Sequence, residues 1–316
     1  MAMPLVETKN LKKYFKTGAG MLHAVEDVNL KIMPGKTLGV VGESGCGKST
    51  LGRTILRLQP ATSGEVLYNG ENILKYKGKD MQKIHLNMQM VFQDPYSSLD
   101  PRMSVHNLIA EPVQMCGLLK TKAEINEHVR EIMDMCGLPA DQANLFPHEL
   151  DGGLRQRVGL ARAMAVSPKF IVCDEPVSAL DVSIQAQILN LLMDLQEQRE
   201  LSYMFITHDL CVVKHISDEI MVMYMGQVVE HAKTAELFAN PVHPYTKALL
   251  HAVPTIDLSK RNREGFMLRG EVTSPINPAP GCRFAPRCPY ATDKCKENVC
   301  LKEVSPDHFV ACSLCD

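Results

Sequence analysis

The sequence lacks the features that would indicate a membrane-spanning, secreted or nucleic-acid-binding protein. No apolar run approaches the ~18 residues that a transmembrane helix needs. Residues 1–7 lack the basic and then apolar pattern of a signal peptide. The formal net charge of −2 gives no basic excess for a nucleic-acid surface. We therefore expect a cytosolic protein without a nucleic-acid partner, and any membrane attachment should go through another subunit.

The 316 residues, 45% of them hydrophobic, are enough for roughly two domains with a sizeable core. Cysteine use is uneven. Of the 11 cysteines, one group falls within residues 282–315, namely Cys282, Cys288, Cys295, Cys300, Cys312 and Cys315. In a reducing cytosol such a group more often indicates a bound metal than disulfides. The other cysteines are scattered and suit small buried apolar side chains.

A glycine-rich loop at residues 42–50 is the most informative stretch. It reads Gly42-Glu43-Ser44-Gly45-Cys46-Gly47-Lys48-Ser49-Thr50 and fits the pattern G-x-x-x-x-G-K-[ST], which wraps the phosphates of ATP or GTP. Residues 37–41 predict a buried strand before it, and residues 50–56 predict a helix after it, so that backbone N–H groups and the helix dipole face an anion. We expect Lys48 to reach the β- and γ-phosphates and the Ser49 hydroxyl to bind Mg²⁺. A glycine turn without a ligand is disfavoured because the strand, the spacing, the lysine and the hydroxyl all agree.

The other patterns also favour an α/β fold. Apolar clusters between glycine and proline predict strands at 5–11, 23–32, 63–70 and 88–93, and the third of these ends in an Asn-Gly turn. Apolar residues at spacings of three and four predict helical structure over about 104–138.

Two acidic residues end another predicted strand. The apolar run 169–173 is typical of a buried parallel strand, and Asp174 and Glu175 follow at its carboxyl end, where α/β sheets bind ligands. We expect Asp174 to hold Mg²⁺ through water, and Glu175 to orient or deprotonate the attacking water. A plain helix N-cap is the alternative for such a pair. The next predicted strand, 201–207, ends at His208, which can reach a γ-phosphate from there.

Together these motifs resemble the nucleotide-binding subunits of ABC transporters over about residues 4–240. The matching positions occur in the family's order. Gln93 matches the glutamine loop, which touches Mg²⁺, and residues 150–157 match the signature motif, with Asp151, Gly152 and Gly153. Asp181 matches the loop to the opposite subunit, and His208 matches the switch histidine. The aromatic residue that stacks on adenine corresponds to Phe15, with Tyr14 a close rival and a plain strand-end residue as the alternative for either.

The resemblance implies a P-loop ABC ATPase core, in which a RecA-like sheet is joined by an antiparallel β subdomain and a helical subdomain, plus a small cysteine-rich C-terminal extension. It assigns the ATPase core to 1–93 and 155–238, and the helical signature subdomain to 94–154. The rest, 239–316, is then a C-terminal domain of the oligopeptide-transporter type. It also implies that two ATPase subunits pack head to tail, with each ATP between the phosphate loop of one and the signature of the other. Hydrolysis would then drive two membrane permease subunits.

The C-terminal third narrows the resemblance. Residues 240–250 and 281–290 are similar to the Pro-x-His-Pro-Tyr-Thr segment and the cysteine-containing segment of oligopeptide and dipeptide importers, which nickel importers share. The chain therefore resembles one ATPase subunit of a bacterial peptide importer at the cytoplasmic face of the cell membrane. An extracellular peptide-binding protein would be an indirect partner. The cargo stays open between oligopeptide, dipeptide and nickel.

The signature departs from the family's Leu-Ser-Gly-Gly-Gln. Asp151 replaces the serine and Leu154 replaces the glutamine. In the family that serine hydroxyl donates to the γ-phosphate held by the other subunit, and an ionised carboxylate cannot donate. At ~4 Å and an effective dielectric constant of ~20, each such pair of like charges costs about 4 kcal/mol before Mg²⁺ or a proton offsets it. Asp151 also suits the N-cap of the next helix. We therefore favour a heterodimer with two unequal ATP sites.

The resemblance extends to a ligand set. The pattern Cys282-x5-Cys288-x6-Cys295-x16-Cys312 matches the family's C-terminal extension, which in some members resembles a [4Fe–4S] site. Four thiolates suit either an Fe–S cluster or Zn²⁺, but this spacing lacks the close C-x2-C pairs of zinc ribbons. We favour the cluster, with Zn²⁺ or no metal as the alternatives.

Two other functions stay open. A soluble ABC ATPase that acts on DNA or ribosomes would usually carry a long coiled-coil insert or two cassettes, and the sequence has neither. A non-hydrolysing, nucleotide-gated partner is disfavoured by Glu175 and His208, although Asp151 mildly favours it.

Overall fold

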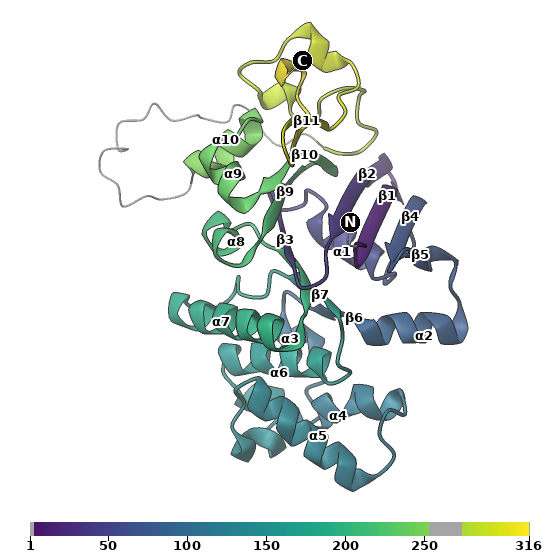
Figure 1. Cartoon of the computed structure of the whole chain (residues 1–316), viewed down its shortest axis with the longest axis vertical. Coiled ribbons are helices and arrows are strands. Elements are labelled where there is room, and N and C mark those ends of the chain that lie inside the picture. The colour runs from purple at the N-terminus through teal and green to yellow at the C-terminus, as the bar shows by residue number, and fades with distance from the viewer. Residues whose placement is uncertain (1–2, 253–273, 316) are drawn as a thin grey trace. The chain divides into compact units, whose positions relative to one another are not determined.

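The computed structural model describes residues 3–252 and 274–315. The chain folds as two compact units, which are coloured by residue number in Figure 1. The first unit comprises 1–32, 37–74 and 205–316, and the second comprises 33–36 and 75–204. The stretch 253–273 of the expected C-terminal domain lies outside the described residues. Within the described ranges, no helix is long and apolar enough to cross a membrane.

An antiparallel sheet in the first unit has the strand order β2-β1-β4-β5 (Figure 1). Its strands are β1 (Val6–Thr17), β2 (Gly20–Ile32), β4 (Ser63–Tyr68) and β5 (Glu71–Asn72). The expected strands at 5–11, 23–32 and 63–70 are confirmed, and the first two are extended to a hairpin at 17–20. The Asn-Gly turn is confirmed as well, because Asn69 and Gly70 both have positive φ, as a two-residue hairpin turn requires.

A second sheet in the first unit carries the predicted buried strand β3 (Thr37–Val41). This strand pairs in parallel with β9 (Glu219–Tyr224), so that Val40 lies opposite Met221. The sheet continues antiparallel through β10 (Gln227–Lys233), β12 (His308–Val310) and β11 (Lys302–Ser305). All of β3 is buried, which explains its unbroken apolar sequence. The helices of this unit are α1 (Lys48–Ile55), α8 (Leu210–Ile216), α9 (Thr234–Ala239) and α10 (Pro244–His251).

The second unit contains the other predicted parallel strands. Here β6 (Met88–Val91) pairs in parallel with β7 (Phe170–Asp174), which confirms both expectations. The expected strand at 201–207 is β8 (Ser202–Ile206), which begins in this unit. The helices are α2 (Gly78–Asn87), α3 (Pro95–Ser98), α4 (Val105–Met115), α5 (Lys122–Met135), α6 (Gly152–Met164) and α7 (Val182–Arg199).

The helical stretch expected over 104–138 is two helices, α4 and α5, which Figure 1 shows beside α6. The chain leaves α4 through Gly117, whose φ of +61° lies in the left-handed region. It enters α5 through a capping box, in which the Thr121 side chain accepts from the Glu124 N–H and the Glu124 carboxylate accepts from the Thr121 N–H. The apolar spacing alone does not reveal this break.

Candidate functional site

The glycine-rich loop between β3 and α1 adopts a conformation that only glycine tolerates. Gly42, Gly45 and Gly47 have φ of +154°, +78° and +106°. A Cβ atom on Gly42 would lie 2.2 Å from the Met223 carbonyl oxygen, and one on Gly47 would lie 2.1 Å from the Ala24 carbonyl oxygen. The loop thus packs directly against the backbone of the same unit, and neither glycine can be replaced without moving that backbone.

The lysine of this loop, Lys48, is held inside it. The Lys48 side chain is buried, and its ammonium group donates to the carbonyl oxygens of Gly42 at 2.7 Å and Glu43 at 3.1 Å. The Lys48 ammonium also lies 3.9 Å from the sulfur of Cys46, which is buried, while Ser44 is exposed. The first turn of α1 contains no acidic residue, so its positive dipole end is not offset by a carboxylate there.

A pocket joins the loop to the β1–β2 hairpin. It is lined by Phe15, Leu22, His23, Ala24, Gly45, Gly47, Lys48, Ser49, Thr50, Gly226 and Pro275. An aromatic ring, a lysine and two hydroxyls therefore share one cavity with an anion-binding loop. That combination suits an aromatic base at one end and a phosphate chain at the other.

Phe15 and its rival Tyr14 have different surroundings. Phe15 lines the pocket. Tyr14 instead stacks on His23, with 4.0 Å between ring centroids, and donates its hydroxyl to Glu26 at 2.6 Å. These contacts favour Phe15 as the stacking aromatic.

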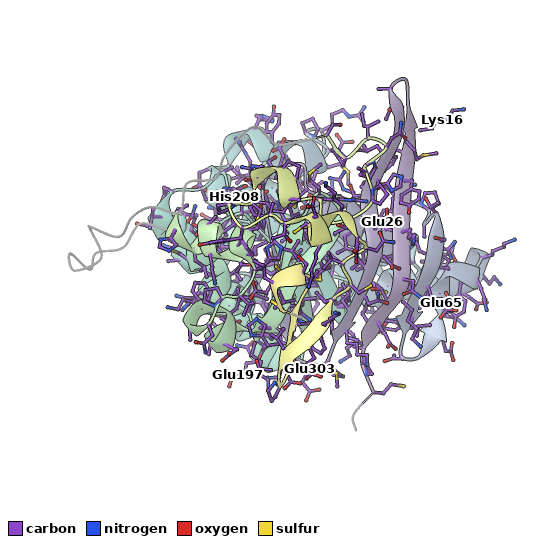
Figure 2. The ribbon with its side chains drawn as sticks, turned by 90° about the horizontal axis from the view of Figure 1, so that it is seen from above. Lys16, Glu26, Glu65, Glu197, His208 and Glu303 are labelled. Carbon is purple, nitrogen blue, oxygen red and sulfur yellow. The ribbon has the colours of Figure 1, made fainter. Side chains whose placement is uncertain are left out.

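Glu26, which Figure 2 labels, is the centre of an ionic network beside this pocket. Its carboxylate lies 2.5 Å from His23 Nδ1, 3.2 Å from the Lys12 ammonium and 3.0 Å from the Arg283 guanidinium. Burial by itself raises the pKa of Glu26, but the hydrogen bonds from Tyr14, His23 and Lys12 outweigh it and lower the pKa to about 2. The network therefore holds a charged carboxylate in a partly buried place.

In the second unit the structure brings Gln93 and Glu175 together. Gln93 Nε2 donates to Glu175 Oε2 at 2.9 Å. Glu175 has a φ of +47°, which is uncommon for a residue with a side chain and is found at functional sites. Asp174, the last residue of β7, is fully buried. The acidic pair is thus not a plain helix cap: one member ends a core strand and the other has a left-handed backbone.

The signature residues lie at the start of α6. Asp151 caps this helix, since its Oδ1 accepts from the Leu154 N–H at 2.8 Å. A Cβ atom on Gly152 would lie 3.3 Å from Leu180, and one on Gly153 would lie 2.7 Å from Ile184. The signature glycines therefore pack against the start of the next helix, where Asp181 is the N-cap.

That cap is direct, because Asp181 Oδ1 accepts from the Ile184 N–H at 3.0 Å and starts α7. His208 belongs to the first unit, where it is exposed and lies between β8 and the Asp209 cap of α8. Figure 2 labels it.

The cysteine-rich segment is compact, and the cysteines within the described ranges are all free thiols. The Cys282 N–H donates to the Cys295 carbonyl oxygen at 2.8 Å. Burial raises the pKa of Cys282 to about 11, and the neighbouring Cys295 and Cys312 act in the same direction. Burial raises the pKa of Cys288 too, again with contributions from Cys312 and Cys295.

The four predicted ligands are thus close enough to interact electrostatically. However, the part of the chain that the structure describes contains no group of three or more His, Cys, Asp or Glu side chains gathered closely enough to hold a metal ion.

Sequence reasoning missed two residues that contact the phosphate loop from far along the chain. The Arg287 guanidinium binds the Glu43 carboxylate at 2.9 and 3.1 Å, and the Tyr245 hydroxyl accepts from the Glu43 N–H at 2.8 Å. Both residues lie in the two C-terminal segments that carry the family resemblance, so a signal existed, but nothing in the sequence linked it to this loop.

Comparison with known proteins agrees with this geometry. Residues 25–178 match the ABC transporter family, and residues 229–295 match the family described as the oligopeptide/dipeptide transporter C-terminal region. The chain is 47% identical over 320 residues to AppF, an oligopeptide transport ATP-binding protein of Bacillus subtilis (strain 168), which covers 98% of this chain and 97% of AppF. The chain belongs to the ABC transporter ATP-binding subunits of the oligopeptide and dipeptide type.

Two further relatives extend this result. OppF, another oligopeptide transport ATP-binding protein of Bacillus subtilis (strain 168), is 49% identical over 315 residues, which are 99% of this chain and 97% of OppF. Among solved structures, the dimeric ATP-binding cassette MJ0796 in a post-hydrolysis state with ADP and Pi is 30% identical, with a TM-score of 0.67 over 72% of this chain and 98% of that one. The ABC ATPase fold expected from the sequence is therefore confirmed, and the chain is an ABC-type ATPase.

Proposed function

We propose that this chain is the ATP-hydrolysing subunit of a bacterial peptide importer. The observation that carries the proposal is the pocket in which Phe15, Lys48 and Ser49 line one cavity. The match to oligopeptide transport proteins over nearly the whole chain supports peptide as the transported class.

Within this proposal the phosphate loop binds the triphosphate. Phe15 stacks on adenine, backbone N–H groups at the start of α1 face the phosphates, and the Lys48 ammonium moves from the loop carbonyls to the β- and γ-phosphates.

The residues proposed to hold Mg²⁺ are Ser49, Gln93 and, through water, Asp174. Their hydroxyl, amide and carboxylate oxygens are the hard donors that Mg²⁺ prefers. The Gln93 amide nitrogen is directed to Glu175, which leaves the amide oxygen as its ligand atom. When bound, Mg²⁺ supplies charge neutralisation at the β- and γ-phosphates.

Glu175 is the proposed general base, and His208 is the proposed contact to the γ-phosphate. Glu175 accepts from Gln93, which fixes the orientation of the carboxylate that is proposed to accept the proton of the attacking water. The water attacks the γ-phosphorus, the bond to the β-phosphate oxygen breaks, and Glu175 takes the proton of the water. The products are ADP and inorganic phosphate.

We also propose the domain and partner organisation that the sequence suggests. The ATPase core is 1–93 and 155–238, the helical signature subdomain is 94–154, and the C-terminal domain is 239–316. A second ATPase subunit packs head to tail with this one, two permease subunits receive the motion at the cytoplasmic face of the membrane, and an extracellular binding protein delivers the cargo.

The partner subunit is proposed to be a different chain. Asp151 is directed to the backbone of its own helix and donates no hydrogen bond there. Its carboxylate disfavours a triphosphate placed at the same helix end, whereas the N–H groups of Gly152 and Gly153 favour one. The ATP site that this signature completes is therefore slower than the site built on Lys48 and Glu175.

A second proposal concerns Cys282, Cys288, Cys295 and Cys312, which we assign to a [4Fe–4S] cluster, with Zn²⁺ or no metal as the competing outcomes. Their spacing, which resembles that of the family's C-terminal extension, supports the cluster. Anaerobically purified protein should be brown, absorb near ~400 nm and contain iron and sulfide. Colourless protein without iron would exclude the cluster, and stoichiometric zinc would assign Zn²⁺ instead.

The test of the main proposal is to co-purify the chain with its permease and ATPase partners and to measure ATPase activity in lipid. Di- or oligopeptides with the binding protein should stimulate hydrolysis. Stimulation by Ni²⁺ alone would reassign the cargo, and stimulation by DNA or ribosomes in the absence of the permeases would contradict the importer.

A further inference from the structure

The C-terminal segment 282–288, which we call the brace segment, contacts the phosphate loop directly. It contains η5 (Ala285–Arg287), and Arg287 is nearly fully buried. Arg287 Nη1 lies 2.9 and 3.1 Å from the two oxygens of Glu43, the second residue of the loop. An ion pair with so little exposure of the arginine is weakly screened and geometrically fixed.

Glu43 connects Arg287 to Lys48 through its own hydrogen bonds. The Glu43 carbonyl oxygen accepts from the Lys48 ammonium at 3.1 Å and from the Cys46 N–H at 3.2 Å. Its N–H donates to the Tyr245 hydroxyl at 2.8 Å. Every polar group of Glu43 is therefore engaged: the carboxylate and the N–H by C-terminal residues, and the carbonyl by the phosphate loop.

A buried aromatic cluster fixes the residues that bind Glu43. Tyr224, Tyr245 and Phe284 meet with ring centroids 4.7 to 5.4 Å apart, and each is almost fully buried. Phe284 belongs to the brace segment and Tyr224 to β9. Burial raises the pKa of Tyr245, so its hydroxyl stays neutral. The packed cluster fixes the brace segment, so that Arg287 is rigid enough to position Glu43.

The other end of the brace segment contacts residues that adjoin the lining of the same pocket. Arg283 donates to the Met225 carbonyl oxygen and to Glu26, the latter at 3.0 Å. Met225 precedes Gly226, which lines the pocket and whose N–H donates to the Cys46 carbonyl oxygen at 2.7 Å. Two arginines of the brace segment, each adjacent to a cysteine, thus bind residues next to the pocket.

We infer that Arg287 is a positioning residue for the phosphate loop: through Glu43 it holds the loop in the conformation that places the Lys48 ammonium for the phosphates. This inference rests on the proposed assignment of the loop to ATP. Loss of Arg287 leaves the Glu43 carboxylate without its charged partner, and the loop is no longer held in one conformation. ATP then has to order the loop on binding, which weakens its affinity.

The test is a double-mutant cycle on the full-length chain, with the dissociation constant of MgATP measured well below each variant's melting temperature. Arg287→Gln and Glu43→Gln should each weaken MgATP binding by about tenfold, and the double variant should be no weaker than either single variant. Arg287→Lys should restore most of the affinity. Lys233→Gln, which removes an exposed ion pair to Asp307 in the same C-terminal region, should bind as the wild type does.

Lys48→Ala separates failure of the inference from failure of the proposed site. If Lys48→Ala binds MgATP as the wild type does, the loop assignment is wrong. If Lys48→Ala loses binding while Arg287→Gln and Glu43→Gln keep wild-type affinity, the loop assignment stands and the positioning role is overturned. Additive losses in the double variant would also overturn it, because a merely structural role of each residue predicts them.

Discussion

Gln93 donates its amide hydrogen to Glu175 at 2.9 Å, so the residue of the glutamine loop orients the carboxylate that follows β7. The contact joins residues that are 82 positions apart. It explains how a residue at an uncommon φ of +47° keeps one side-chain direction.

Glu175→Gln should leave MgATP affinity within about twofold of the wild type and lower hydrolysis by about 10²–10⁴-fold in the assembled complex, since only the base is lost. Its amide oxygen still accepts from Gln93, so the local geometry is kept. Single-turnover hydrolysis and nucleotide binding measure the two effects. Glu197→Gln, on the exposed side of α7, is the matched control and should hydrolyse ATP normally. Equal hydrolysis by the Glu175 and Glu197 variants would remove Glu175 from the reaction.

Gly47→Ala should abolish nucleotide binding and destabilise the protein by more than about 1 kcal/mol, because φ is +106° and the new Cβ would lie 2.1 Å from the Ala24 carbonyl oxygen. Chemical denaturation and nucleotide titration check this. Gly159→Ala is the control: the site is inside α6 with nothing within 4 Å, so alanine should stabilise the helix by up to about 1 kcal/mol. A Gly47 variant as stable as the wild type would show that the loop relaxes freely.

Asp151→Ser should raise the steady-state ATPase rate of the heterodimer, because a hydroxyl replaces the carboxylate at the proposed second site. Serine is also a good N-cap, so the melting temperature should change little. The rate is measured in the assembled complex with the partner subunit unchanged. An unchanged rate would remove the support for two unequal sites.

Glu26→Gln should make the free energy of unfolding less dependent on pH in acidic solution. The folded-state pKa of about 2 lies below the ordinary value of 4.5, so the unfolded chain binds the proton first. The stabilisation is fully present above about pH 5 and is lost as the pH falls toward 2. Urea unfolding across this range should show a steeper loss for the wild type than for Glu26→Gln. Parallel curves would place the acid sensitivity elsewhere.

The sequence predicted the elements whose signals are local. The phosphate loop, β3 and β7 follow from short runs and glycine spacing, and the acids at 174–175 lie where the strand pattern placed them. It did not predict β9 to β12, because runs such as 220–224 are apolar throughout and carry no period that distinguishes a strand from a buried helix. The choice between Tyr14 and Phe15 likewise depends on the register of β1 against β2.

The contacts around Glu43 could not be predicted for a different reason. Arg287 is 244 positions away, and its partner is set by how the brace segment packs on Tyr224 and Tyr245. Local residue spacing does not reveal tertiary packing of this kind, although residues 240–250 and 281–290 both resemble segments of the importer family.

We expect ATP hydrolysis at the Lys48 and Glu175 site to power peptide uptake. Uptake of labelled peptide into proteoliposomes tests this directly, with the assembled complex in the membrane and the binding protein and MgATP on their respective sides. We predict ATP-dependent accumulation that Glu175→Gln abolishes and Glu197→Gln leaves intact. Accumulation that persists in the Glu175→Gln complex would contradict it.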